Sequence, residues 1–215
     1  MLVVIAAIAA VPGYRLPASS SSKTASPVHV LPGEHLGAPG ELPGERLGAP
    51  REGGGVLRTV DGSALGEADG AVPDGTTVFD DDVPGVAKLD PALLGALRRA
   101  ASAAADDGVT FLVNSGWRSR EYQEQMLREA VLKYGSIEEA ARWVATPDTS
   151  AHGSGDAVDL GPAKATAWLS KHGGTYRLCQ IYRNEPWHYE LRPDAIRHGC
   201  PRMYPDPTHD PRMQQ

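Results

Sequence analysis

Histidine and carboxylate side chains that could bind a metal gather in two short segments of the sequence. Residues 150–159 read SAHGSGDAVD, and residues 185–191 read EPWHYEL. Zinc accepts imidazole nitrogen and carboxylate oxygen in a tetrahedral shell, and a catalytic zinc keeps one position open for water. His152 and Asp159 offer two such ligands, and His188 offers the third. We therefore predict a zinc centre made by two histidines and one aspartate.

A carboxylate that could act as a base lies close to the third ligand. Water bound to zinc needs a group that takes its proton and passes it to the departing amine. Glu185 stands three residues before His188, and Pro186 bends the chain between them. We predict that Glu185 is this base. The alternative is an ordinary surface carboxylate, because a base is defined by a geometry that the sequence does not contain.

A third polar segment, SGWRSREYQ, contains Arg118. Its guanidinium is a candidate for binding the charge that develops on a tetrahedral intermediate, or a substrate carboxylate. A structural salt bridge is the alternative. The candidates for substrate binding share a polar or aromatic side chain near these groups: Ser115, Gln123, Ser150 and Trp187. A role in a turn or cap is the alternative for the first three, and a place in the core for the tryptophan.

These residues resemble the zinc D-alanyl-D-alanine carboxypeptidases and dipeptidases of the VanY and VanX kind, the peptidase M15 family. The family pattern Ser-x-His-x-x-Gly-x-Ala-x-Asp matches residues 150–159, and Glu-x-Trp-His matches residues 185–188. The pattern Ser-Gly-Tyr-Arg-Ser matches residues 115–119, where Trp117 replaces the tyrosine and keeps an aromatic ring without the hydroxyl. The resemblance extends over about residues 89–192.

The resemblance implies the activity and the cofactor. It implies a zinc peptidase that acts on peptidoglycan stem peptides ending in D-Ala-D-Ala. It also implies a role for each of five residues: His152, Asp159 and His188 as zinc ligands, Glu185 as general base and acid, and Arg118 as an aid to the transition state.

Helices and strands that could position these residues are predicted from apolar and capping patterns. Asp90 and Pro91 begin a helix that runs to about residue 105. The β-branched run VTFLV predicts a buried strand at 109–113, followed by a turn at 114–116. The remaining predicted helices lie at 120–134, from Ser136 to Pro147 and at 162–172, and the remaining strands at 157–160, 178–182 and 187–191.

The order of these elements predicts an α+β fold. The later strands are separated too briefly for repeated parallel crossovers, so we expect a small, mainly antiparallel sheet with helices packed on one side. We place the zinc site in a cleft on this sheet. Alternation along the last strand should point His188 and Glu190 to one face, and Trp187 and Tyr189 to the other.

The composition divides the chain into three parts. Residues 1–11 are an apolar run, far short of the ~20 residues of a membrane span, so we expect an export signal or membrane anchor at 1–12, with an apolar tail as the alternative. Residues 13–55 are rich in Pro, Gly and Ser and contain LPGEHLGAP and LPGERLGAP in an eleven-residue repeat, which predicts a linker. All Trp, Phe and Cys residues follow, and we place the zinc peptidase domain at 56–210.

Charge and cysteines limit the partners and the compartment. The formal net charge is −6 and basic residues are interspersed with acidic ones, so we expect no nucleic-acid binding. Cys179 and Cys200 are the only cysteines, and an even pair in an exported chain suggests a disulfide, with two buried thiols as the alternative. We expect a monomer that faces the cell wall, secreted or anchored by its N-terminal segment.

The sequence thus favours a carboxypeptidase that removes the terminal D-alanine from stem peptides. Two enzymes of the same family remain as alternatives, a D,D-dipeptidase and an endopeptidase that cuts within the stem or cross-link. A zinc-containing module that binds wall fragments without cleaving them is an alternative of another class, which the presence of Glu185 opposes.

Overall fold

The computed structural model describes residues 57–58 and 64–214 of the chain. These residues belong to a single unit, Glu41–Gln215. The predicted apolar start at 1–12 and the repeat-containing linker at 13–55 lie outside the described residues. Within the described ranges, none of the helices combines the length and the apolar character that a membrane crossing requires.

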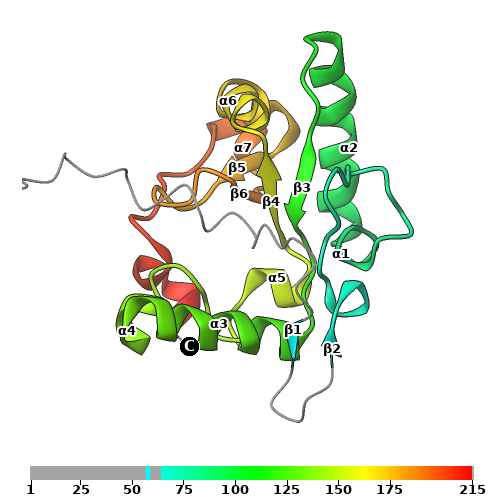
Figure 1. The fold of residues 1–215 in the computed structure, drawn as a ribbon. Coiled ribbons are helices and arrows are strands. Elements are labelled where there is room, and N and C mark those ends of the chain that lie inside the picture. The colour runs from blue at the N-terminus through cyan, green and yellow to red at the C-terminus, as the bar shows by residue number, and fades with distance from the viewer. Residues whose placement is uncertain (1–56, 59–63, 215) are drawn as a thin grey trace, which may run out of the picture. The chain divides into compact units, whose positions relative to one another are not determined.

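Four antiparallel strands form the central sheet (Figure 1). Their order across the sheet is β3-β4-β6-β5, so the strand that follows β3 in the chain also lies beside it. A separate pair is formed by β1 and β2. The strands are β1 (Leu57–Arg58), β2 (Ala64–Leu65), β3 (Leu112–Ser115), β4 (Ala157–Gly161), β5 (Leu178–Gln180) and β6 (His188–Leu191).

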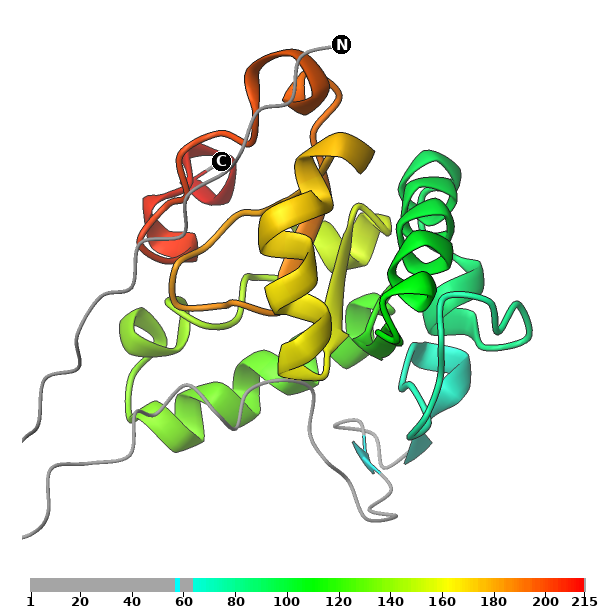
Figure 2. The same cartoon turned by 90° about the horizontal axis from the view of Figure 1, so that it is seen from above.

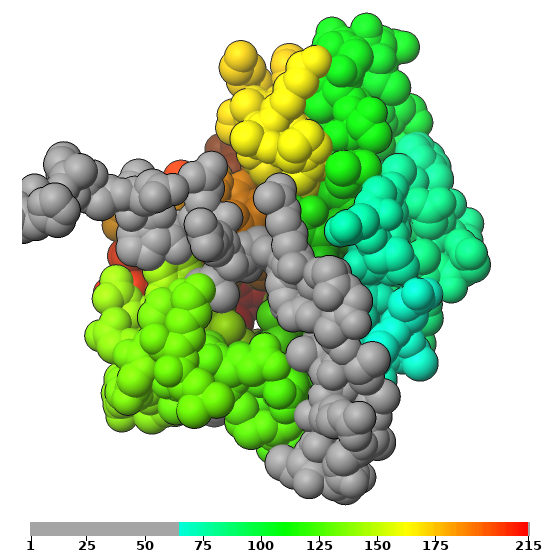
Figure 3. Space-filling model, in the orientation of Figure 1, coloured from blue at the N-terminus to red at the C-terminus, as the bar shows by residue number. Residues whose placement is uncertain are grey.

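Two long helices pack on one face of this sheet (Figures 1 and 2). They are α2 (Pro91–Asp106), which contacts β5 and β6, and α6 (Ala163–His172), which contacts β4 and β5. The main core lies between them and the sheet, and includes Leu93, Val158 and Tyr189. In the space-filling view, α6 and the chain around the end of α2 meet at the surface (Figure 3). The predicted α+β fold with an antiparallel sheet is confirmed.

The remaining helices are shorter or lie apart from this core. Helix α3 is capped at its start by Ser119 and at its end by Gly135, and it packs on α4 around Ala130, Ala140 and Val144. The helices are α1 (Pro84–Ala87), α3 (Arg120–Tyr134), α4 (Ile137–Ala140), α5 (Ala151–Ser154) and α7 (Ala195–His198), with 3₁₀ turns η2 (Glu67–Asp69), η3 (Gly173–Tyr176), η4 (Pro207–His209) and η5 (Pro211–Gln214).

The predicted helices and strands differ from the structure in several places. The strand expected at 109–113 begins at Leu112 and includes Ser115, because pairing with β4 continues through the polar residues expected to turn. The helix expected to reach Pro147 ends at Ala140, and the chain continues in turns. Residues 151–154, where no helix was predicted, form the short helix α5.

The two cysteines form the predicted disulfide. Cys179 in β5 is bonded to Cys200, with 1.98 Å between the sulfur atoms and 5.5 Å between the Cα atoms. Cys179 pairs in register with Glu190 of β6. The disulfide therefore fixes the chain that follows α7 to the sheet beside Glu190.

Candidate functional site

The register of three strands places polar side chains in a row on the sheet face opposite α2 and α6. Asp159 of β4 pairs with Ser115 of β3 on one side and with His188 of β6 on the other. Their neighbours Val158 and Tyr189 also pair, and they point into the main core. Because side chains alternate along a strand, the core residues and the site residues are set by the same register.

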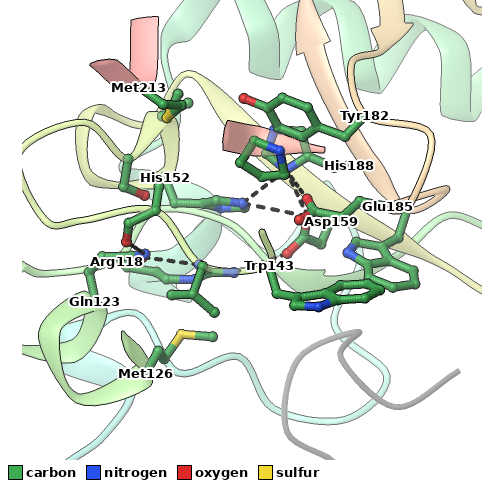
Figure 4. Close-up of a pocket in the computed structure, with 16 residues that line it drawn as sticks. Arg118, Gln123, Met126, Trp143, His152, Asp159, Tyr182, Glu185, His188 and Met213 are labelled. Atoms are coloured by element: carbon green, nitrogen blue, oxygen red, sulfur yellow. Dashed lines mark hydrogen bonds and ion pairs between the residues drawn. The ribbon is translucent and has the colours of Figure 1, made fainter. Parts of the chain in front are cut away.

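The three predicted ligands meet (Figure 4). His188 Nδ1 lies 3.2 Å from Asp159 Oδ1 and 3.3 Å from His152 Nε2, and the latter two atoms are 3.5 Å apart. Zinc with bonds of about 2.0–2.1 Å to a tetrahedral shell holds its ligand atoms roughly 3.3–3.4 Å apart. The triangle of nitrogen, nitrogen and oxygen therefore fits a zinc ion, and all three residues are buried.

Helix α5 brings His152 to the strands. The ring Nδ1 of His152 lies 2.8 Å from the carbonyl oxygen of Gly116, which makes Nδ1 the donor and leaves Nε2 free for a metal. The helix follows Ser150 and ends at Gly155, whose φ is 80°. The carbonyl of Gly155 accepts a hydrogen bond from the amide of Asp90, 2.9 Å away, so α5 is fixed against the start of α2.

Substitution of Gly155 by alanine should show how tightly α5 is held. A Cβ atom at Gly155 would lie 2.5 Å from the carbonyl oxygen of Lys88, whereas one at Gly135, with φ of 84°, would meet nothing within 4 Å. Gly135→Ala should cost about 1–2 kcal/mol, the cost of left-handed backbone alone. Gly155→Ala should cost about 3 kcal/mol or more, because overpacking adds to that cost. Denaturant unfolding measures both, and equal losses would contradict the close approach.

His188 is held on the side away from the triangle by Glu190. The distance from His188 Nε2 to Glu190 Oε1 is 3.3 Å, which confirms that the two side chains share one face of β6. Glu190 in turn accepts from Arg212 at 2.7 and 3.1 Å and pairs with Arg192 at 2.8 Å. Burial raises the pKa of Glu190, but hydrogen bonds from His188 and Arg212 lower it to well below its ordinary value.

Arg118 lies beneath the triangle and contacts one of the ligands. Its Nη2 donates to Asp159 Oδ2 at 3.0 Å, its Nε to Ser115 Oγ at 2.7 Å and its Nη1 to Gln123 Oε1 at 3.0 Å. Asp159 thus presents Oδ1 to the metal position and Oδ2 to Arg118. Ser115 and Gln123, which we predicted to bind substrate, both hold this guanidinium, and only Gln123 of the two is among the described residues that line the pocket.

Glu185 lies at the open side of the triangle (Figure 4). Its Oε2 is 3.7 Å from His188 Nδ1, and its Oε1 is buried without a hydrogen-bond partner among the described residues. Burial raises the pKa of Glu185, His188 lowers it and the nearby Asp159 carboxylate raises it, and together these effects place the pKa at about 8. A buried carboxylate oxygen with no partner is a suitable acceptor for the proton of a water held in the pocket.

The pocket has walls that the sequence motifs did not predict. Trp187 and Ser150 line it as expected, whereas Trp117 is not among its described lining residues and lies under Lys88, with Nζ 3.6 Å from the ring centroid. Trp143 comes from the turns after α4 and has no motif to mark it. Further lining residues without a motif are Met126, Tyr182, Pro207 and Met213.

Comparisons with known proteins match the part of the chain that contains the site. The family model of VanY, described as D-alanyl-D-alanine carboxypeptidase, matches residues 86–194. A D-alanyl-D-alanine carboxypeptidase of Enterococcus faecalis is 32% identical over 112 residues, which cover 40% of this chain and 42% of that protein. The chain therefore spans less than half the length of this relative.

Several solved structures have a partial likeness to this chain. A mutant of the vancomycin-resistance D,D-pentapeptidase VanY with Zn(II) is 29% identical, with a TM-score of 0.45 and coverage of 48% of this chain and 72% of that one. VanYB with D-alanine-D-alanine is 22% identical, with a TM-score of 0.48 and coverage of 70% and 86%. DacB from Streptococcus pneumoniae is 25% identical, with a TM-score of 0.42 and coverage of 51% and 70%.

The matched stretch contains the complete metal triangle, Arg118 and Glu185, and it amounts to just over half of the chain. The predicted resemblance to the peptidase M15 family is confirmed. The chain belongs to the VanY family of D-alanyl-D-alanine carboxypeptidases.

Proposed function

We propose that this chain is a zinc-dependent D-alanyl-D-alanine carboxypeptidase that hydrolyses the terminal peptide bond of peptidoglycan stem peptides. One observation carries the proposal. Three donor atoms, from His152, Asp159 and His188, are spaced as in a tetrahedral zinc shell, and the unpartnered carboxylate oxygen of Glu185 lies beside them. Membership of the VanY family supports the same reaction.

The proposed chemistry divides between the metal and the side chains. Bound zinc lowers the pKa of water towards 7 and polarises a carbonyl group. Glu185 takes the proton of the attacking water and then donates it to the departing amine of D-alanine. Arg118 fixes Asp159, and its guanidinium has five N–H donors, of which three are engaged by the contacts given above. We assign the other two to negative charge on the substrate.

The pocket supports a short peptide as the substrate. Ser150 and Gln123 are polar lining residues, and Trp143 and Trp187 offer aromatic surface. We propose that these polar groups bind the carboxylate and amide of the terminal residue, and that the indoles pack on the preceding residue. A site of this kind buries the ligand largely by apolar contact and orients it by a few polar groups.

Action outside the cytoplasm is part of the proposal. The disulfide between Cys179 and Cys200 supports an oxidising location, where such bonds persist. We propose that the chain acts as a monomer at the cell wall, that residues 1–12 export or anchor it, and that residues 13–55 separate the catalytic unit from this segment.

Mass spectrometry of muropeptides tests the proposed reaction. Purified zinc-loaded protein is incubated with pentapeptide muropeptides, with and without a chelator, and the expected result is the loss of one alanine that the chelator prevents. Release of a dipeptide or of two stem fragments would replace the carboxypeptidase with a dipeptidase or endopeptidase. Muropeptides that bind to the protein and remain intact would replace it with a non-catalytic wall-binding module.

A further inference from the structure

The C-terminal residues reach the metal centre although they lie beyond the family match. The match ends at residue 194, whereas Pro207 of η4 and Met213 of η5 line the pocket. Arg212, also in η5, contacts Glu190 of β6. These residues come from a stretch that none of the family motifs covers, and they contribute both a wall and a charged contact to the site.

Arg212 joins two buried carboxylates. Its Nη1 and Nη2 donate to Glu190 at 2.7 and 3.1 Å, and its Nε donates to both oxygens of Asp210 at 3.1 Å. Glu190 is 1% exposed and Asp210 is 0% exposed. A buried carboxylate is costly unless it is paired, so each of them depends on this guanidinium. Arg192 also pairs with Glu190, at 2.8 Å, but it has no recorded contact with Asp210.

Each of the two carboxylates is connected to His188, Glu190 directly and Asp210 through Tyr182. Glu190 lies 3.3 Å from His188 Nε2, on the side of the ring opposite the metal position. Asp210 accepts a hydrogen bond from the Tyr182 hydroxyl at 3.0 Å, and the Tyr182 ring packs on the His188 ring with 5.1 Å between centroids. The five side chains therefore form a closed circuit, here called the His188 clamp: His188, Glu190, Arg212, Asp210 and Tyr182.

The C-terminal stretch is fixed to the sheet before it reaches the clamp. The disulfide attaches Cys200 to β5. Tyr204 then forms a parallel bridge with Tyr182, with hydrogen bonds of 2.9 Å to the backbone of Ile181 and Arg183. Arg212 follows eight residues later, in a stretch that the disulfide and this bridge hold beside β5 and the residues that follow it.

We propose that Arg212 is a positioning residue that sets the orientation of His188 through Glu190, Asp210 and Tyr182, and thereby sets the affinity of the site for zinc. The inference rests on the proposed zinc site but not on the identity of the substrate. Groups that orient a metal-bound histidine typically contribute 10–100-fold to metal affinity or activity. Arg212 does not contact His188 itself. It contacts Glu190, which orients His188, and Asp210, which holds Tyr182 against the His188 ring.

Zinc affinity of the full chain, measured by competition with a chromophoric chelator, tests this role. The variants are Arg212→Ala, Arg212→Lys and Arg142→Ala. Arg142 is a matched control because it also pairs with an aspartate of the C-terminal stretch, Asp206, at 3.2 Å, but has no contact with the His188 clamp. The visible spectrum of the cobalt-substituted proteins reports the geometry of the ligands, and circular dichroism reports folding.

Arg212→Ala should raise the Kd for zinc about 10-fold or more and shift the cobalt spectrum. Arg212→Lys keeps the charge but loses the paired geometry, so its Kd should fall between those of Arg212→Ala and the parent chain. Arg142→Ala should bind zinc within about twofold of the parent, on the scale of a partly exposed ion pair. If Arg212→Ala fails to fold, Arg212→Lys alone decides, and a parent-like Kd and spectrum would overturn the proposal.

Two further results separate this inference from the proposed function. Equal losses in Arg212→Ala and Arg142→Ala would overturn the positioning role, because the effect would then be general to the C-terminal stretch. A parent protein that binds zinc tightly but releases no D-alanine would overturn the proposed carboxypeptidase, and the zinc affinities of the variants would still decide the role of Arg212.

Discussion

Glu185→Gln should lower the release of D-alanine from a D-Ala-D-Ala peptide by about 10²–10⁴-fold while zinc stays bound, since general acid–base catalysis contributes about this much. Glutamine keeps the shape of the side chain but cannot take up a proton. Glu185 is 3.7 Å from the nearest ligand nitrogen, and its other oxygen has no partner among the described residues, so the fold does not depend on its charge. Steady-state kinetics and zinc content measure the two effects.

An exposed glutamate provides the control for this substitution. Glu138 is exposed on α4 and is not among the residues that line the pocket. Glu138→Gln should leave turnover within about twofold of the parent, because exposed charges contribute little. If Glu185→Gln retained most of its turnover with zinc bound, the proton would have to be moved by another group and our assignment would be wrong.

Asp159→Asn should remove zinc from the site and destabilise the fold. Asp159 presents one oxygen to the metal triangle and the other to Arg118, at 3.0 Å. Burial raises the pKa of Asp159, but His152 and His188 together lower it far below its ordinary value, so the group is a carboxylate. The asparagine amide carries no charge, so the buried guanidinium of Arg118 loses its charged partner. The free energy of unfolding should fall by about 3–5 kcal/mol.

Zinc content and denaturant unfolding check this double effect. Asp156, three residues earlier, is exposed and accepts a hydrogen bond from Ser154, and it provides the control. Asp156→Asn should keep the zinc and lose less than about 1 kcal/mol of unfolding free energy. An Asp159→Asn protein that bound one zinc as tightly as the parent would show that Asp159 is not a ligand.

The metal triangle, and the place of Glu185 beside it, could be predicted from the sequence because each lies in a short segment with distinctive chemistry. His152 and Asp159 are separated by one helical turn and the start of a strand, so local structure carries both to the same place. Helix α3 was predicted at about 120–134, with Gly135 marking its end, and the structure confirms these bounds. The alternation of β6 also placed Glu190 beside His188 correctly.

The parts that were missed depend on contacts between residues far apart in the chain. Arg212 approaches Glu190 only after the chain has returned along β5, and Trp143 reaches the pocket because α4 stops early. Trp117 occupies an aromatic position of the family motif, but Lys88 covers its ring and it is not among the described residues that line the pocket. In each case the neighbour is set by tertiary packing, which overrides any local pattern.

The pairing of Ser115, Asp159 and His188 across three strands limits how this chain can change in length. A strand that slipped by a single residue would turn its functional side chain into the apolar layer and bring a core side chain out. Insertions or deletions inside β4 or β6 should therefore be incompatible with metal binding, whereas the exposed turn that begins at Gly135 has room for them. Recombination of this unit with its relatives should accordingly join segments at such turns and keep each strand whole.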